Sequence, residues 1–205
     1  PWKWAGVSQN PNVTFDMIQA HPELPWDWYE VSKNPNITLD MMLANRNKTW
    51  DWYYISKNPS VTFDTVLARP DLPWMWYGFS KNPNVTLDIM QANPNLPWDW
   101  NGLSQNPNIT IDMVLANLDS PWNWFGLSHN PNTTSLDIVL ANPDLPWDWY
   151  GLSRNPNITF NIVQAHPDLP WDWSGLSWNT SITFDAVLAN PDLPWDWEGL
   201  SYKEQ

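Results

Sequence analysis

Residues 147–170 read WDWYGLSRNPNITFNIVQAHPDLP, and this stretch returns with small changes along the whole chain. Its marker is a pair of tryptophans separated by one residue, and successive pairs lie 24 residues apart, apart from one step of 25. A unit of this size is too small to bury a core alone, so the period predicts a tandem array in which each unit packs on its neighbours. The pairs hold 18 of the 19 tryptophans: Trp2/Trp4, Trp26/Trp28, Trp50/Trp52, Trp74/Trp76, Trp98/Trp100, Trp122/Trp124, Trp147/Trp149, Trp171/Trp173 and Trp195/Trp197.

The unbroken period predicts a single tandem-repeat array over residues 1–205. The chain begins at Pro1 in the middle of a repeat, so we expect the native start to be missing. The last copy replaces a polar residue and a proline by Trp178 and Thr180 and ends in a polar tail, which predicts a C-terminal cap over about residues 178–205. Residues 45–49 (NRNKT) lose both prolines and the leucine of the repeat, which predicts a bend or an insertion point for a partner.

Two short helices per unit fit the pattern best. We expect the first to begin at the proline before each Trp pair, such as Pro146, with an acidic residue in its first turn, and to stop near the Asn155-Pro156 step. We expect the second to begin after a threonine N-cap such as Thr159 and to end before a proline such as Pro167. The step of 25 residues places one extra residue, assigned to Ser135, beside such a cap. The fold class predicted is therefore an all-α solenoid of about eight helix-turn-helix units.

A β-solenoid is the alternative fold. Ile158, Phe160 and Ile162 alternate with polar residues, as the residues of a half-buried strand do. Three prolines per unit and cap residues at two sites favour helices instead.

Within a helix, residues two positions apart point in different directions, so the two tryptophans of a pair are expected to form two separate rows. The second member, such as Trp28, shares a side with Val31 and Ser32, which predicts a buried inner seam. The first member of a pair, such as Trp147, shares a side with one position of the repeat that we call the glycine slot. All seven glycines of the chain, among them Gly151, occupy this position. A glycine inside a helix is unfavourable, so its repetition predicts the close approach of something bulky, such as an aromatic ring of an adjacent unit.

Composition narrows the functional classes. The chain has 22 acidic and 9 basic residues, a net charge of -13 and no basic stripe, which argues against nucleic acid as a partner. Cysteine is absent and no apolar run approaches the ~20 residues of a membrane span, so we expect no thiolate zinc site and no membrane partner. His21, His129 and His166 occupy variable slots and are interpreted as surface variation. No catalytic, cofactor-binding or metal site is predicted, and the chain is not expected to be an enzyme.

Eight Asn-x-Ser/Thr sequences occur in the chain. The capping role of Thr explains their recurrence, so glycosylation stays an alternative that would require secretion. Their asparagines are Asn12, Asn36, Asn47, Asn84, Asn108, Asn132, Asn157 and Asn179.

The recurring NPNIT and NPDLPWDW runs, with Leu-Ser between WDW and NP, resemble the tryptophan-rich tandem repeats of proteins encoded by giant DNA viruses. The resemblance covers almost the whole chain and implies a virion or infected-cell location more than an activity. From the residues themselves we expect a structural or protein-interaction scaffold that associates with a protein partner or with itself, as a filament. The alternative is a carbohydrate-binding rod that uses exposed tryptophans.

Overall fold

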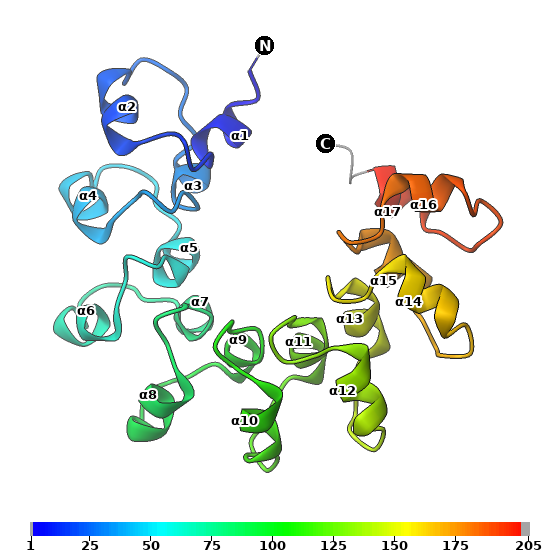
Figure 1. Cartoon of the computed structure of the whole chain (residues 1–205). Helices are drawn as coiled ribbons and strands as arrows, with labels where there is room; N and C mark the ends of the chain where they lie inside the picture. Colours follow the sequence, from blue (N-terminus) through cyan, green and yellow to red (C-terminus); the bar gives the residue numbers. More distant parts are fainter. Residues whose placement is uncertain (1, 202–205) are drawn as a thin grey trace. The chain divides into compact units, whose positions relative to one another are not determined.

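The computed structural model describes residues 2–201, and within that range it contains 17 short helices and no strand (Figure 1). The all-α prediction is confirmed over the described residues, and the alternation around Ile158 does not form a strand. The helix α14, Phe160–Ala165, begins within that segment. Residues 202–205, the tail of the expected C-terminal cap, lie outside the described range.

The helices alternate between two types. First-row helices begin at the second tryptophan of a pair, and second-row helices begin one residue after the cap of the NPNIT run. The first-row helices are α1 Trp4–Ser8, α3 Trp28–Val31, α5 Trp52–Lys57, α7 Trp76–Ser80, α9 Trp100–Ser104, α11 Trp124–His129, α13 Trp149–Arg154, α15 Trp173–Trp178 and α17 Trp197–Ser201. The second-row helices are α2 Phe15–Ala20, α4 Leu39–Ala44, α6 Phe63–Ala68, α8 Leu87–Ala92, α10 Ile111–Leu115, α12 Leu136–Ala141, α14, and α16 Phe184–Leu188.

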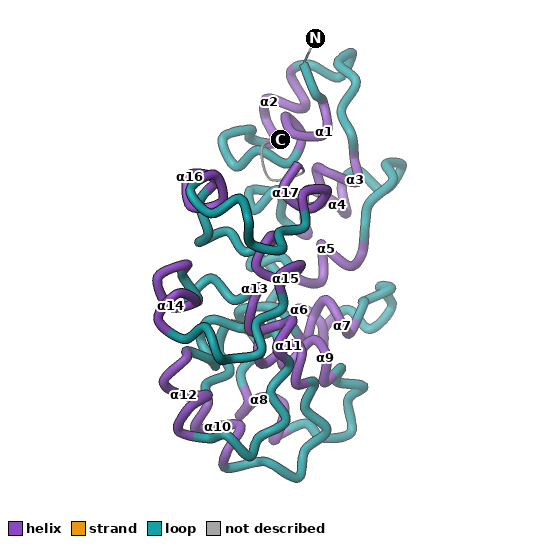
Figure 2. The backbone as a smooth tube through the Cα atoms, turned by 90° about the vertical axis from the view of Figure 1, so that its right-hand side faces the viewer, coloured by secondary structure: helices purple, strands orange, loops and turns teal. Residues whose placement is uncertain are grey.

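The chain divides after Gly102 into two compact parts. In the first part α1, α3, α5 and α7 lie in one row, and α2, α4, α6 and α8 lie beside them in a second row (Figure 1). In the second part the helices α11 to α17 alternate in the same way, and α13 packs on both α11 and α15. Figure 2 shows each helix as a short segment between turns and loops. The first-row helices therefore pack on the first-row helix two places along the chain, as α5 does on α7 and α13 on α15.

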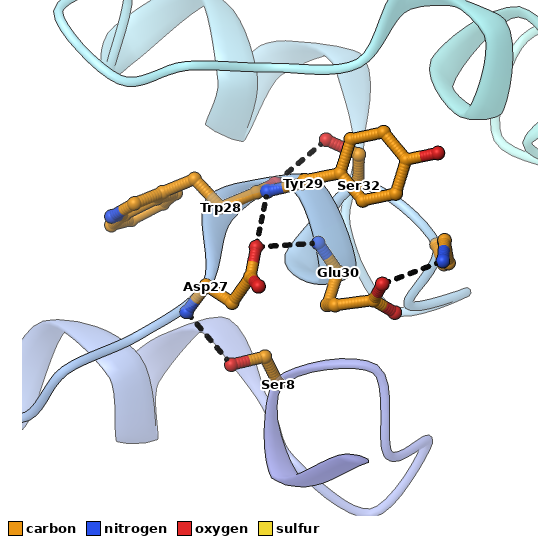
Figure 3. A network of polar contacts seen from close by, with 7 residues as sticks. Ser8, Asp27, Trp28, Tyr29, Glu30 and Ser32 are labelled. Atoms are coloured by element: carbon orange, nitrogen blue, oxygen red, sulfur yellow. Dashed lines mark hydrogen bonds and ion pairs between the residues drawn. The ribbon is translucent and has the colours of Figure 1, made fainter. Parts of the chain in front are cut away.

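The expected start of the first-row helices at proline is wrong. These helices begin three residues after the proline, and the residue between the two tryptophans is the N-cap. Asp27 is extended at φ -87° and ψ 103°, and its Oδ1 accepts the N–H groups of Tyr29 and Glu30 at 3.1 and 3.2 Å (Figure 3). Asp is among the best N-cap residues because its carboxylate satisfies amides that have no partner inside the helix. This cap outcompetes a helix start at Pro25, where the Trp26 N–H instead donates to the Leu24 carbonyl in a tight turn.

The threonine caps of the second-row helices are confirmed in most units. Thr14 Oγ1 accepts the N–H of Met17 at 3.3 Å, and Thr38, Thr62, Thr86, Thr110 and Thr183 do the same in their units. Thr159 sits at the N-cap without this bond. In the 25-residue copy the extra residue moves the cap to Ser135, and Thr134 is buried and donates to the Leu127 carbonyl.

Buried polar side chains join consecutive units. Asn82, which is fully buried, donates through Nδ2 to the carbonyls of Ser56, Asn58 and Val61 at 2.9, 2.8 and 3.1 Å. A buried serine hydroxyl in each first-row helix from α1 to α15 accepts the backbone N–H of the residue between the next two paired tryptophans, as Ser8 does from Asp27 at 3.0 Å (Figure 3). A buried amide or hydroxyl is stable only when hydrogen-bonded, so these contacts fix how one unit meets the next.

Apolar residues fill the space between the two rows. Val31 and Ile37 are completely buried, and Phe15 and Ile18 from α2 pack in the same cluster. The expected burial of Val31 and Ser32 is therefore confirmed. At the divergent residues 45–49 the helix end is kept, because Asn45 Nδ2 donates to the Met41 carbonyl at 2.8 Å and Trp50 Nε1 donates to the Asn45 carbonyl at 3.0 Å.

Candidate functional site

The tryptophans form one interleaved column within each part of the chain instead of two separate rows. The first tryptophan of a pair packs edge-on against the second tryptophan of the preceding pair, with ring centroids 5.2 Å apart for Trp4 and Trp26 and 5.0 Å apart for Trp173 and Trp195. The same contact joins Trp28/Trp50, Trp52/Trp74, Trp76/Trp98, Trp124/Trp147 and Trp149/Trp171. The expectation of separate rows is wrong because the first tryptophan precedes the helix and is not on its surface.

The first tryptophan is also held by a hydrogen bond. Trp26 Nε1 donates to the carbonyl of His21 at 2.8 Å, at the end of the second-row helix of the preceding unit, and Trp171 donates to His166 in the same way. Packed rings with satisfied N–H groups are typical of structural tryptophans. These rings chiefly hold adjacent units together.

The expected close approach at the glycine slot is confirmed at six of the seven glycines, and at Gly78, Gly102 and Gly151 the nearest neighbour is a backbone carbonyl and not a ring. A Cβ added at Gly78 would lie 2.5 Å from the carbonyl oxygen of Tyr53, and one at Gly102 would lie 2.6 Å from that of Tyr77. An aromatic ring atom, Tyr53 Cδ2, is the second neighbour at 3.0 Å from the Gly78 position. At Gly6, in the first unit, nothing lies within 4 Å of the added atom. At Gly78 and Gly102 glycine therefore allows the first-row helix to lie directly against the preceding one, whereas Glu30 and Tyr54 fill the same repeat position in α3 and α5.

A cavity recurs at the same place in three units. In one unit it is walled by Trp171 and Trp173, has a volume of about 360 Å³ and is bordered by Leu193 of the next turn. Its counterparts beside Trp26/Trp28 and Trp50/Trp52 have volumes of about 250 and 560 Å³. The largest one is bordered by Arg46 and Lys48, which belong to the divergent residues 45–49. The tryptophans therefore leave part of their ring surface open to these cavities.

Tyrosines and lysines of three consecutive first-row helices gather in the first part of the chain. We call this set the aromatic–cationic face; it consists of Tyr29, Lys33, Tyr53, Tyr54, Lys57, Tyr77 and Lys81. Lys33 Nζ lies 4.6 Å from the ring centre of Tyr29 and 4.9 Å from that of Tyr54. The rings of Tyr53 and Tyr77 stack at 5.5 Å with 17° between their planes, and Lys81 Nζ lies 5.2 Å from the Tyr77 ring.

Partial burial shifts the pKa values of several side chains of this face. Burial, followed by the charge of Lys81, lowers the pKa of Lys57 below its usual value, and burial lowers the pKa of Lys81. Burial, together with the neighbouring tyrosines, raises the pKa of Tyr53 to about 12. Lys33 forms an ion pair with Glu30 at 2.6 Å. A cavity of about 210 Å³ lies between Lys33, Tyr54 and Lys57.

The second part of the chain carries a related arrangement with different residues. Phe125 stacks on Tyr150 at 6.0 Å, and the Arg154 guanidinium lies 5.6 Å from the Tyr150 ring and 5.9 Å from the Trp178 ring. Sequence reasoning missed both faces, although a signal was present. Four of the nine basic residues occupy one slot of the repeat, at Lys33, Lys57, Lys81 and Arg154. His129, interpreted as surface variation, lies in the same slot.

The last described unit exposes residues that its counterparts bury or half-bury. Trp197 is 51% exposed and Phe184 is 42% exposed, whereas Phe160, the counterpart of Phe184 one unit earlier, is 8% exposed. At the other end of the described range Trp2 is 81% exposed.

No catalytic or metal-binding constellation was predicted. Among residues 2–201 the structure brings together no group of three His, Asp or Glu residues that could hold a metal ion. No helix in the same range is long and apolar enough to cross a membrane. Comparison of the chain with protein-family models, with curated proteins and with solved structures found no match.

Proposed function

We propose that the chain is a non-enzymatic solenoid scaffold that binds protein partners and stacks head to tail with further copies of itself. In a repeat array each unit meets the next through the same joint, so the two halves of that joint are also complementary when they lie on different copies of the chain. The observation that carries the proposal is the exposure of Trp197, Phe184 and Ser201, a set that we call the half-joint, because their counterparts one unit earlier are buried or half-buried.

A complete joint has an aromatic and a polar component. At the joint between the last two units, Trp195 lies 5.0 Å from Trp173 and 5.7 Å from Phe160. The N–H of Asp196 donates to the buried Ser177 hydroxyl at 2.9 Å.

One period further along the chain the corresponding residues are Trp197, Phe184 and Ser201, and all three are exposed. Trp2 occupies the repeat position of Trp195 and is also exposed. Docking of Trp2 on Trp197 and Phe184 would remove ~150–250 Å² of one ring from water, or about 4–6 kcal/mol before the costs of association. A head-to-tail contact that does not close on itself produces filaments. We therefore expect weak association that increases with concentration.

Sedimentation velocity over a dilution series, with electron microscopy of the most concentrated sample, tests this proposal. We expect a sedimentation coefficient that rises with concentration in the wild-type chain and elongated particles in micrographs. Trp197→Ala removes the ring that forms the half-joint, so this variant should stay monomeric.

Leu140→Ala is the matched control, because Leu140 is 47% exposed but lies on α12 away from both end units. It should associate as the wild type does. A wild-type chain that is monomeric at every concentration, or a Trp197→Ala variant that associates normally, would contradict head-to-tail stacking.

A carbohydrate-binding rod is the second candidate, and the recurring cavity beside the Trp pairs supports it. Partly open indole rings are suitable platforms for sugar rings, and the 24-residue period would present one platform per unit. Titration with linear oligosaccharides, followed by tryptophan fluorescence, tests this candidate. Quenching with a spectral shift at low sugar concentration would favour it, and an unchanged spectrum would exclude it.

A further inference from the structure

We propose that the cavity beside Trp50 and Trp52, which we call the divergent cavity, binds a Pro-Asp-Leu-Pro segment of a partner protein. The peptide leucine fills the cavity, and the peptide carboxylate pairs with Arg46 at its border. This inference rests on the protein-binding part of the proposed function and names the chemistry of the partner.

The divergent cavity lies at the copy of the repeat that has lost this segment. Residues 46–49 read Arg-Asn-Lys-Thr, whereas four other copies have Pro-Asp-Leu-Pro at this place, at residues 70–73, 143–146, 167–170 and 191–194. The cavity beside Trp171, which we call the regular cavity, is lined by Leu169 and Leu193, the leucines of two consecutive segments. Lys48 stands at the repeat position of Leu169, so the divergent cavity lacks the first of these two leucines.

The side chain of Lys48 extends towards the preceding Trp pair. Its Nζ lies 4.8 Å from the ring centre of Trp28, which lines the preceding cavity together with Lys48. The divergent cavity has a volume of about 560 Å³, compared with about 360 Å³ for the regular cavity. Cavities of ~300–1,000 Å³ are typical of ligand-binding sites. The divergent copy therefore has space for an added side chain where regular copies carry their own leucine.

The walls of the divergent cavity suit a branched aliphatic group. The half-buried rings of Trp50 and Trp52 border it, and Met42, Leu72 and Pro73 contribute further apolar surface. A leucine side chain that enters the cavity removes apolar surface of both partners from water, which favours binding. The same side chain already lines the regular cavity, so its fit is one that the fold uses elsewhere.

The charged residues at the border select an acidic neighbour for this leucine. Arg46 and Lys48 line the divergent cavity, whereas none of the described residues that line the regular cavity is charged. Asp71 is the carboxylate in the same lining, and both of its oxygens already accept hydrogen bonds from Arg69, at 2.9 and 2.8 Å. A guanidinium binds a carboxylate through two parallel hydrogen bonds, so Arg46 is suited to the aspartate of the segment.

The net charge of the whole chain limits how acidic the ligand is. At -13 the chain repels strongly acidic molecules, so a segment with one carboxylate beside one aliphatic anchor is a better ligand than a polyacidic one. Charge complementarity of this kind sets specificity more than raw affinity.

A partner protein is a better source of the segment than a second copy of this chain, because the chain's own segments are held in folded turns. The N–H of Leu72 donates to the Arg69 carbonyl at 3.2 Å, and the N–H of Trp74 donates to the Leu72 carbonyl at 2.8 Å. Leu193 is held in the same way by Asn190. A second copy would have to break these contacts, whereas an extended segment of a partner would not.

The probe is a fluorescein-labelled peptide, Ala-Asn-Pro-Asp-Leu-Pro, which has the sequence of residues 141–146. Its anisotropy is measured against the full chain, and we expect it to saturate at one peptide per chain. The first control peptide, Ala-Asn-Pro-Asn-Leu-Pro, has the sequence of residues 92–97 and lacks the carboxylate, so it should bind about threefold more weakly. The second, Ala-Asn-Pro-Asp-Ala-Pro, lacks the anchor and should bind about tenfold more weakly.

Lys48→Leu is the main test variant, because it restores the leucine that regular copies carry. The added leucine takes the place of the peptide leucine, so we expect binding about tenfold weaker than in the wild type. Lys48→Gln is its control for the lost charge and should lose much less affinity. Since Lys48→Leu returns the copy to the regular sequence, circular dichroism and urea denaturation should show a fold at least as stable as the wild type.

Arg46→Gln tests the charged contact. We expect about threefold weaker binding, because the exposed Arg46 loses its pairing with the peptide carboxylate. Lys3→Gln makes the same change in net charge at an exposed residue outside the cavity and should bind as the wild type does.

Four results would overturn the proposal. They are no peptide binding to the wild-type chain, wild-type affinity in Lys48→Leu, equal losses in Arg46→Gln and Lys3→Gln, and equal affinity for the three peptides. An oligomer of glucuronic acid that competes as strongly as the peptide and is affected in the same way by the variants would assign the cavity to an acidic sugar and overturn the peptide assignment.

The Trp197→Ala variant separates this inference from head-to-tail stacking. It should bind the peptide with wild-type affinity whether or not the wild-type chain forms filaments. Loss of peptide binding in this variant would place the peptide at the half-joint and contradict a site at the divergent cavity.

Discussion

At the scale of single residues, the glycine slot is where the packing tolerates least change. A Cβ at Gly78 would meet the Tyr53 carbonyl at 2.5 Å, and a carbonyl within a helix cannot move aside as the end of a flexible side chain does. Overpacking of this kind costs ~1–3 kcal/mol. We therefore expect Gly78→Ala to lower the free energy of unfolding by that amount in urea denaturation.

Gly6→Ala is the matched control for this prediction. Nothing lies within 4 Å of the added Cβ, and alanine is favoured over glycine in a helix by ~1 kcal/mol. This variant should be as stable as the wild type or more stable. Equal destabilisation by the two substitutions would mean that helix–helix contact is not the reason for glycine.

The raised pKa of Tyr53 is expected to make the free energy of unfolding depend on pH in the alkaline range. Burial raises its pKa in the folded chain to about 12, so the unfolded chain, with an ordinary value of about 10, loses its proton first. The stability contribution is therefore complete below pH ~10 and is lost as the pH rises towards ~12. Tyr53 is partly accessible to solvent, so we expect a loss of only ~1 kcal/mol. As the pH rises through this range, the urea concentration at the unfolding midpoint should fall more for the wild type than for Tyr53→Phe. An equal fall in the two proteins would show that Tyr53 is not the cause of the pH dependence.

At the scale of elements, each helix has only 4–6 residues, far below the ~12 residues at which an isolated helix becomes marginal. Caps and neighbouring units must therefore hold the helices. Thr183 and Thr159 test the cap contribution in neighbouring units, because both are exposed and followed by phenylalanine. Only Thr183 accepts a hydrogen bond, from the N–H of Ala186 at 3.3 Å.

We expect Thr183→Ala to cost ~1 kcal/mol of stability and Thr159→Ala to cost much less. Thermal and urea denaturation measure both. A larger effect at Thr159 would show that its role lies in packing or in the unfolded chain instead of in capping.

At the scale of the whole molecule, equivalent joints make units interchangeable. Removal of residues 53–76 deletes one period and joins Trp52 to Tyr77, which reproduces the sequence Trp-Tyr found at Trp52-Tyr53. The stability of a repeat array is approximately a sum of units and their joints. We therefore expect this deletion to keep the helical signal per residue and to lower stability slightly.

Deletion of half a period in the same region is the control. It places a first-row helix where the neighbouring units require a second-row helix, so we expect it to abolish cooperative unfolding. Circular dichroism and urea denaturation distinguish the two deletions. If both variants unfolded alike, the 24-residue unit would not be the unit of packing.

The sequence by itself determined the features that depend on neighbours within one unit. Proline positions ended the second-row helices, threonines capped them, and the repeated glycine indicated a close approach. The period and the absence of strands in the described range also agree with the sequence pattern. These signals are local, because backbone capping and proline geometry involve residues only a few positions apart.

Only the tertiary structure decided what happens between units. The first-row helix starts at Trp28 because Asp27 caps it, while the Asp27 N–H is held by Ser8 of the preceding unit. The single tryptophan column and the aromatic–cationic face arise from residues 22 to 25 positions apart, such as Trp4 with Trp26 and Tyr53 with Tyr77. No pattern within one unit specifies which atoms of the next unit will lie opposite, because that depends on how two packed surfaces fit together.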